Sequence, residues 1–321
     1  QGSLTTPPCL EGLTWTVFTQ PVHISSKQLH QYKGALAHLP RTALALVNNR
    51  PTQPLNGRIP ELMVDMGWTY SSYAEYAVGP ANWQSQYSMC SGTEQSPIDL
   101  NSVVTTVTND VTVGLQAGLS TTGSCTVFKG TETQNTWKVD GLNTCAGGAR
   151  LNFQLPGTSN QVTLAQFHLH APSEHTVDGA RYDAEVHFVH VNANGDPAAV
   201  IGVFLHAVEG APDNEFLAQF WDKFDNMEHN VSQPINPYTD FFPMNNGVIE
   251  SGYWSYAGSL TTPPCSEGAS WFVLKDPIVI SYNQLDRYNS RLAELPQTAE
   301  SMANNRPTQP LNGRTLTLTA P

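Results

Sequence analysis

The sequence has few charged residues: Asp, Glu, Lys and Arg make up 13% of its 321 residues, about half the share usual in globular proteins. Only 15 Lys and Arg stand against 27 Asp and Glu, which gives a formal net charge of −12. Binding to phosphate backbones needs clustered basic side chains, so the composition predicts no nucleic-acid partner. Runs of about 18 apolar residues are also absent, so no transmembrane segment is predicted.

Cysteine is scarce as well, and no Cys-x-x-Cys pair or zinc-finger spacing occurs. The five cysteines are Cys9, Cys90, Cys125, Cys145 and Cys265. Metal sites built on thiolates are therefore not expected, and two disulfides with one thiol left over are the simplest interpretation. Asn230-Val231-Ser232 is an acceptor triplet for N-glycosylation. Both features favour an oxidising location: extracellular, periplasmic or at the cell surface.

An internal repeat organises the chain. Residues 2–58 align with residues 258–314 without a gap, and 35 of these 57 positions are identical. The period of 256 residues is that of a whole domain, because solenoid repeats run about 20–50 residues. We therefore predict that residues 1–58 are a partial duplicate of the C-terminal part of a domain, that residues 59–66 are a linker, and that residues 67–321 are the complete domain. A tandem domain upstream is a candidate partner.

Strand patterns dominate residues 67–321. Alternating side chains predict strands over 161–170 and 184–192, and a short apolar run over 199–204 suits a central strand. The Val- and Thr-rich stretch 103–113 is also predicted as a strand. Apolar side chains at helical spacing predict a helix over 213–228, and Ser281 as an N-cap predicts a second over 281–295. The expected fold is mixed and β-dominated, with a large sheet and peripheral helices.

Two histidines on one predicted strand indicate a metal site. His168 and His170 are two residues apart, so a strand points both to one face about 6.5–7 Å apart. An isolated pair of this kind is more often an ordinary surface or core feature, but His187 on the next strand offers a third imidazole. Three neutral imidazoles with one open position are typical of catalytic zinc. Gln166 and Glu185 each precede a histidine by two residues, so they are candidate acceptors for the second ring nitrogens.

Several longer motifs occur around these histidines in a characteristic order. They are Gln95-Ser96-Pro97-Ile98-Asp99, Gln166-Phe167-His168-Leu169-His170, Ser173-Glu174-His175, Ala184-Glu185-Val186-His187 and Ser259-Leu260-Thr261-Thr262-Pro263-Pro264. In these motifs the chain resembles the alpha-type carbonic anhydrases, and its extra copy is similar to tandem-duplicated forms of green algae. The resemblance implies a mostly antiparallel, twisted sheet. It also implies zinc-dependent, reversible hydration of carbon dioxide to bicarbonate and a proton, by attack of zinc-bound hydroxide.

The resemblance also assigns roles to single residues. Thr261 would accept a hydrogen bond from the hydroxide and donate to Glu174, because an ionised carboxylate only accepts. Tyr70 and Asn135 would belong to the water network, and Asn135 stands where the family often has a proton-shuttling histidine, although an amide does not titrate near neutral pH. The apolar substrate pocket would comprise Val189, Val200, Leu260 and Trp271.

Extracytoplasmic members of the family similarly link the regions of Cys90 and Cys265. Cys125 and Cys145 would then pair by elimination. His175 and His190 match buried structural histidines, so neither is expected to bind metal.

Two other functional classes compete with this interpretation. One is a catalytically silent binding or matrix protein on the same fold, but silent relatives typically lack a zinc histidine and all three are present here. The other is a cupin-like metal oxygenase, which also uses a His-x-His pair but lacks the flanking motifs.

Overall fold

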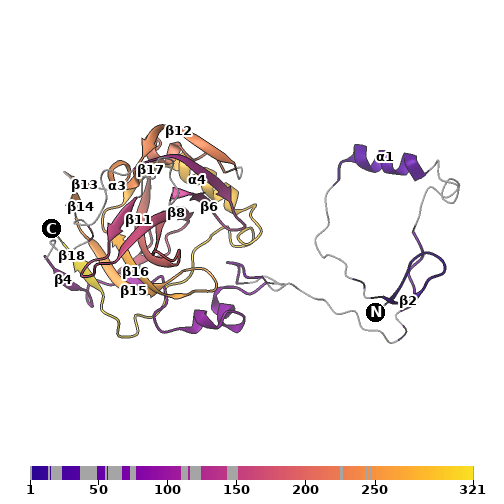
Figure 1. Cartoon of the computed structure of the whole chain (residues 1–321), viewed down its shortest axis with the longest axis horizontal. Coiled ribbons are helices and arrows are strands. Elements are labelled where there is room, and N and C mark those ends of the chain that lie inside the picture. Colours follow the sequence, from indigo (N-terminus) through magenta and orange to yellow (C-terminus); the bar gives the residue numbers. More distant parts are fainter. Residues whose placement is uncertain are drawn as a thin grey trace. The chain divides into compact units, whose positions relative to one another are not determined.

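The structure, a computed structural model, describes residues 2–13, 15, 24–36, 49–54, 56, 67–72, 77–109, 115, 124–142, 151–224, 227–242, 244–245, 248–249 and 251–320. It forms two units, Gln1–Met63 and Val64–Pro321 (Figure 1). The linker predicted over 59–66 lies outside the described residues, so the predicted domain boundaries stay a prediction.

The first unit contains a short hairpin and a helix. Its strands β1 (Gly2–Ser3) and β2 (Glu11–Leu13) are antiparallel, with Gly2 opposite Leu13. Its helix α1 spans Ser26–Leu36.

The second unit is built on strands, with short helices around them. The strands are β3 (Asp99–Leu100), β4 (Thr106–Thr108), β5 (Cys125–Glu132), β6 (Trp137–Asp140), β7 (Asn152–Gln154), β8 (Gln161–His170), β9 (Thr176–Val177), β10 (Ala184–Val191), β11 (Pro197–Val208), β12 (Glu228–Ile235), β13 (Met244–Asn245), β14 (Val248–Ile249), β15 (Tyr253–Ser259), β16 (Glu267–Leu274), β17 (Ile278–Ser281) and β18 (Thr317–Thr319). The helices are the 3-10 helices η1 (Pro80–Ser85) and η2 (Ser88–Ser91), and the α-helices α2 (Glu215–Ala218), α3 (Pro237–Asp240) and α4 (Tyr282–Leu292).

One large sheet runs through this unit. Its strands follow the order β12-β5-β6-β8-β10-β11-β16-β15-β18-β4, while β17 pairs with β11 and β7 with β8. The pairs β11–β16, β11–β17 and β18–β4 are parallel, and the other pairs in the described part of this sheet are antiparallel. The predicted fold class, a β-dominated, mostly antiparallel sheet with peripheral helices, is confirmed.

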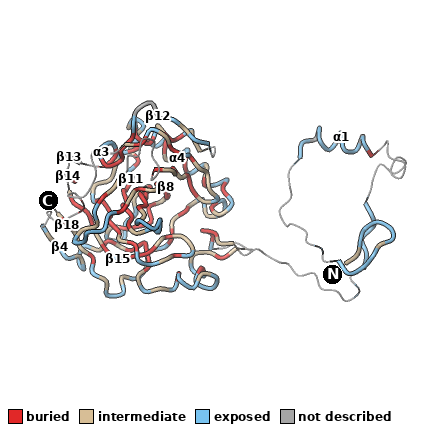
Figure 2. Tube along the Cα trace, viewed as in Figure 1, coloured by how far each residue is buried: buried red, intermediate tan, exposed pale blue. Residues whose placement is uncertain are grey.

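The two faces of the central strands have different roles, because side chains alternate along a strand. On β10, Val186 and Phe188 enter the main apolar core, which also holds Phe167 of β8. The residues that alternate with them, Glu185 and His187, point to the opposite face. Figure 2 shows buried residues concentrated along central strands such as β8 and β11. β10 is buried on both faces and β8 mainly on its core face, so the histidines are held on a rigid support.

Two sequence predictions about helices have different outcomes. The helix α4 is confirmed, and Ser281 caps it in a capping box with Gln284. The helix predicted over 213–228 is wrong, because α2 covers only Glu215–Ala218 and β12 begins at Glu228. The helical spacing of the apolar residues did indicate which side chains are buried, since Phe216 and Phe220 enter the core. β12 pairs with β5 from Glu228 onward. This tertiary contact outweighs the local helical preference, so the helix ends after one turn.

The strand predicted over 103–113 is also shorter than expected. Within its described part only Thr106–Thr108 is a strand, and Val103 and Val104 form an exposed turn. None of the helices in the described ranges is long and apolar enough to cross a membrane.

Candidate metal centre

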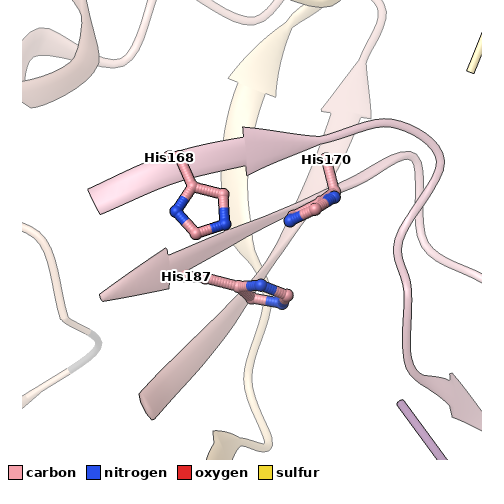
Figure 3. Close-up of side chains that lie close together, drawn as sticks. All are labelled: His168, His170 and His187. Atoms are coloured by element: carbon pink, nitrogen blue, oxygen red, sulfur yellow. The ribbon is translucent and has the colours of Figure 1, made fainter. Parts of the chain in front are cut away.

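Neighbouring strands bring three imidazoles together. His168 and His170 lie on one face of β8, and the antiparallel register places His187 of β10 directly opposite His168. The ring centroids are 4.9 Å apart for His168 and His170, 5.4 Å for His168 and His187, and 4.5 Å for His170 and His187. One nitrogen from each ring lies within 4.8 Å of the others, and the rings face a common space (Figure 3).

Each imidazole is oriented by an acceptor on its outer side. Nδ1 of His168 lies 2.9 Å from Oε1 of Gln166, and Nε2 of His187 lies 2.9 Å from Oε1 of Glu185. These are the two acceptors proposed from the sequence. Each ring donates N–H to its acceptor, so the other nitrogen keeps a lone pair for the central space.

The third acceptor could not be located from the sequence pattern. Nδ1 of His170 lies 2.6 Å from the backbone oxygen of Asn304, 134 residues further along the chain. The side chain of Asn304 in turn donates to the carbonyl oxygens of Leu169 and Asn135. The only available signal was the repetition of the Asn-Asn-Arg-Pro run at 48–51 and 304–307, which carries no information about a hydrogen-bond partner.

Burial keeps these imidazoles neutral. It lowers the pKa of His170 to about 3 and holds the pKa of His168 well below its ordinary value; the neighbouring histidines add to both effects. Burial also lowers the pKa of His187, although Glu185 opposes this. A neutral imidazole is the form that binds a metal ion.

Two buried polar atoms at this point have no hydrogen-bond partner within the described residues: Nε2 of His170 and Oε2 of Glu174. They lie 3.5 Å apart, and Oε2 lies 3.8 Å from Nδ1 of His187. Orphaned buried polar atoms are costly unless something binds them. Three neutral nitrogens in this arrangement fit a tetrahedral zinc ion with one open position.

Glu174 and Thr261, the residues predicted to orient the nucleophile, are brought together. Both are buried, and the Thr261 hydroxyl lies near enough to the Glu174 carboxyl group to act on its pKa. Burial raises the pKa of Glu174 to about 8, while the backbone N–H of Arg306 and the Thr261 hydroxyl oppose the rise. Oε1 of Glu174 accepts from that N–H at 2.7 Å. A bound dication would favour the ionised carboxylate further.

A hydrogen-bonded chain extends behind His187. Oε1 of Glu185 also lies 2.7 Å from Nδ1 of His175, whose Nε2 lies 2.7 Å from the hydroxyl of Tyr256. That hydroxyl donates to Ser96 at 2.9 Å. Although burial opposes it, the two histidines hold the pKa of Glu185 well below its ordinary value. His175, which the resemblance matched to a buried structural histidine, is buried and contacts Glu185 and Tyr256. The contact with Tyr256 was not predicted.

Of the residues proposed for the apolar pocket, Trp271 lies beside a candidate ligand, with its ring centroid 4.8 Å from that of His187. Val189, Val200 and Trp271 belong to a single buried cluster, in which Val189 faces Val200 and Val200 faces Trp271 across the strands. Ala269 is buried in the same cluster. Leu260 is half-buried beside Thr261 in sequence and is not a member of it.

The two residues assigned to the water network differ in their surroundings. Tyr70 is buried, and its hydroxyl has no hydrogen-bond partner within the described ranges; burial holds its pKa well above the ordinary value. The side-chain oxygen of Asn135 accepts from the hydroxyl of Thr133 at 2.7 Å. Asn135 is therefore held locally at the position where the resemblance expects a titrating histidine.

A disulfide joins Cys90 to Cys265, the pairing implied by the resemblance. Cys125 is buried and disulfide-bonded, but Cys145 lies outside the described residues, so that pairing stays a prediction. Cys9 is a free thiol. Because Cys265 follows Thr261 by four residues, the Cys90–Cys265 bond fixes the loop that carries Thr261.

The large sheet and its cluster of three histidines have the arrangement of a carbonic anhydrase. The chain belongs to the eukaryotic-type carbonic anhydrase family, whose model matches residues 1–60 and 78–320. The resemblance to the alpha-type carbonic anhydrases is confirmed, while the likeness to tandem-duplicated forms stays a prediction.

Similar proteins include a carbonic anhydrase of Klebsiella pneumoniae, 40% identical over 47% of this chain and 55% of its own length. Another, from Dunaliella salina, is 31% identical over 98% of this chain and 56% of its own length. Human carbonic anhydrase 3 is 32% identical over 77% of this chain and 96% of its own. The chain thus spans little more than half of the first two relatives.

Solved structures match the same part of the chain. The alpha-carbonic anhydrase of Thermovibrio ammonificans, in complex with the inhibitor sulfanilamide, aligns with a TM-score of 0.59 and 32% identity over 78% of this chain and 99% of its own. Dioscorin in complex with ascorbate aligns with a TM-score of 0.61 and 25% identity over 79% of this chain and 98% of its own. These matches exclude the cupin-like alternative.

Proposed function

We propose that the protein catalyses the zinc-dependent, reversible hydration of carbon dioxide to bicarbonate and a proton. The observation that carries this proposal is the set of three neutral imidazoles, two buried and one half-buried, each with its own outer acceptor, beside the orphaned Oε2 of Glu174. His168, His170 and His187 would hold the ion. Zinc would supply the Lewis acidity that makes hydroxide available near neutral pH, the behaviour for which carbonic anhydrase is the best-known example.

The chain's own residues would orient and confine the reaction. The Thr261 hydroxyl would donate its hydrogen to the ionised Glu174 carboxylate, so that its lone pairs would be left to accept from the nucleophile and orient it. Val189, Val200 and Trp271 offer an apolar surface to carbon dioxide, which has no net dipole and gains little from polar contacts. Asn135 does not titrate, so protons would leave through solvent or buffer rather than through a histidine at this position.

The repeat provides a matched control for the test. In stopped-flow carbon dioxide hydration, Thr261→Ala should lower kcat/KM by on the order of 10²-fold, because the nucleophile loses its alignment. Thr261→Ser should keep most of the rate. Thr5→Ala, the same change in the first copy, should leave it unchanged. A protein that holds one zinc ion but hydrates carbon dioxide no faster than the buffer would contradict the proposal and favour the silent binding protein.

We also propose an extracytoplasmic location. The Cys90–Cys265 disulfide and the exposed Asn230 on β12 support it, because disulfides persist in oxidising compartments and glycans need accessible asparagines. Mass spectrometry of the protein from its native source would test both: unmodified Asn230 together with reduced Cys90 would argue against the location.

A further inference from the structure

The three candidate ligands differ in exposure. His170 and His187 are buried, whereas His168 is half-buried. Because all three rings face one common space (Figure 3), the side of this space next to His168 is the side nearest to solvent. A small molecule that enters or leaves the metal centre would pass there. Residues that flank His168 on the neighbouring strand therefore lie at the entrance.

Lys138 flanks His168 on strand β6, which lies beside β8 in the sheet (Figure 1). In this antiparallel pair Lys138 is directly opposite His168, and Val139 is directly opposite Phe167. Directly opposite residues point to one face of a sheet, with Cβ atoms about 4.5–5.5 Å apart. Val139 and Phe167 belong to the main apolar core, so Lys138 lies on the other face, with the histidines.

Lys138 shares this face with an acid of its own strand. Its ammonium lies 3.1 Å from a carboxylate oxygen of Asp140, and each of the two side chains is 31% exposed. One residue separates the two on the strand, so both point to the face of His168. An ammonium has three N–H donors, and one carboxylate oxygen does not use all of them. Lys138 can therefore donate to a further acceptor.

The charge of Lys138 reaches the metal centre. Burial lowers the pKa of His168 most, followed by His170 and His187, and the positive charge of Lys138 lowers it further. A charge that acts on the imidazole of His168 also acts on an anion beside it. The chain as a whole repels anions, because its formal net charge is −12. A cation at the entrance offsets this repulsion where an anion must pass.

The proposed reaction interconverts a neutral molecule and a monovalent anion. A cation at the entrance attracts bicarbonate and leaves carbon dioxide almost unaffected, since only bicarbonate carries a net charge. We propose that Lys138 is an anion-binding residue, which holds bicarbonate at the entrance to the metal centre, and that Asp140 competes with the anion for the ammonium group. The identity of the anion rests on the proposed function.

A purely structural ion pair is the alternative. Partly exposed pairs contribute little to stability, and loss of either partner would then leave the affinity for anions unchanged. The anion-binding role instead requires opposite effects at two residues of one ion pair. Loss of the cation weakens anion binding, and loss of the competing carboxylate strengthens it.

The test titrates thiocyanate, a monovalent anion, into the full chain loaded with cobalt(II), whose visible absorbance changes when an anion joins the metal. We expect Kd for thiocyanate to rise about threefold in Lys138→Met, because the attraction of a partly exposed charge is lost. Lys138→Arg keeps the charge and should keep the Kd, while Asp140→Asn should lower it. An unchanged Kd in Lys138→Met would overturn the proposal, and so would an unchanged or raised Kd in Asp140→Asn.

Inhibition by bicarbonate extends the test to the proposed product. In stopped-flow carbon dioxide hydration, the inhibition constant of bicarbonate should follow the same order among the variants as Kd for thiocyanate. The ratio of kcat/KM in the two directions is not informative, because the equilibrium between carbon dioxide and bicarbonate fixes it in every variant. Equal inhibition constants in Lys138→Met and the original protein would overturn the assignment of bicarbonate.

Lys275→Met is the matched control. Lys275 is exposed and follows the end of β16, four positions beyond Trp271, so the change removes the same charge from a different part of the sheet. Both constants should stay as they are in the original protein. A rise equal to that of Lys138→Met would show that net charge alone sets the affinity for anions, and would overturn the proposal.

Two further outcomes separate this inference from the proposed function. If Lys138→Met does not fold and binds no cobalt, the direction of the change in Asp140→Asn decides the inference. A chain that binds cobalt but, with zinc, hydrates carbon dioxide no faster than the buffer refutes the proposed function, while the thiocyanate titration still decides whether Lys138 binds an anion. A chain that takes up no metal would overturn both.

Discussion

Replacing Cys90 and Cys265 together by alanine removes a crosslink between residues 175 apart in sequence. In the chain-entropy account, a loop of this length restricts the unfolded chain by about 17 cal/mol/K, which corresponds to about 5 kcal/mol at 25 °C. For a domain of this size, each kcal/mol shifts Tm by about 2–4 °C. We therefore expect the free energy of unfolding to fall by about 5 kcal/mol and Tm by about 10–20 °C.

The fold should survive this change, because hydrogen bonds hold the same regions together. Nε2 of Gln95 donates to the backbone oxygen of Cys265 at 3.2 Å, and Arg306 donates to the backbone oxygen of Cys90 at 3.3 Å. These contacts do not involve the sulfur atoms. The folded variant should therefore still bind zinc, while it unfolds at lower denaturant concentration.

Urea unfolding at 25 °C, followed by tryptophan fluorescence, would measure the effect. Cys9→Ala is the matched control, because Cys9 is a free thiol, and it should leave the unfolding midpoint unchanged. Treatment of the original protein with a reductant should also lower the free energy of unfolding, as the double substitution does. A loss smaller than about 2 kcal/mol would refute the entropic reasoning.

Three further predictions concern the site and the first unit. His187→Ala should abolish zinc binding, whereas His206→Ala, at an exposed histidine paired with Asp183, should keep one ion per chain; full zinc content in the first variant would refute the ligand set. Asn135→His should raise turnover in dilute buffer and little in concentrated buffer, and equal turnover in dilute buffer would count against this position as a shuttle site. A chain shortened to residues 60–321 should keep its zinc content and turnover, and loss of either would show that the first unit is structural.

Local patterns were sufficient to predict the parts of the fold that carry the metal site. The strands that hold His168, His170 and His187 alternate around these histidines, and their predicted limits at 161–170 and 184–192 agree with β8 and β10 within one residue. Alternation is visible in the sequence because one face of each strand packs in the apolar core while the other holds the histidines. The capping box of α4 is equally local, so Ser281 predicted its start.

Long-range partners could not be predicted in this way. The acceptor of His170 is a backbone oxygen in a distant loop, and every residue has such an oxygen, so no side-chain pattern identifies it. Tyr256 reaches His175 from a strand 81 positions further on, which only the sheet order determines. The prediction of a helix over 213–228 was wrong for a related reason. Apolar spacing indicates which side chains are buried, but the pairing of β12 with β5 determines where the helix ends.

His190 offers a test of how burial controls stability away from the metal ligands. It is fully buried, and its Nε2 lies 2.7 Å from the hydroxyl of Tyr238. That hydroxyl donates to the backbone oxygen of Leu151, so it accepts from Nε2, which carries a hydrogen. Burial lowers the pKa of His190 to about 3, whereas an exposed histidine titrates near 6.5.

The sign of the pH effect follows from these two values. Between pH 6.5 and pH 3 the unfolded chain takes up a proton at this residue that the folded protein does not, so stability falls as the pH falls. From pH 7 to pH 5 the loss due to His190 is about 2 kcal/mol. His190→Phe keeps an aromatic ring beside Phe153 and Tyr238 and removes the titrating group, at a cost of about 1 kcal/mol for the lost hydrogen bond.

The variant should therefore be less stable than the original protein at pH 7 and more stable at pH 5. Urea unfolding of both proteins at both pH values, with a chelator present to keep them metal-free, measures the difference without interference from zinc release. Other buried histidines contribute equally to both proteins and cancel in the comparison. If the variant lost stability by the same amount as the original between pH 7 and pH 5, His190 would have to be charged in the folded protein, and burial would not control its protonation.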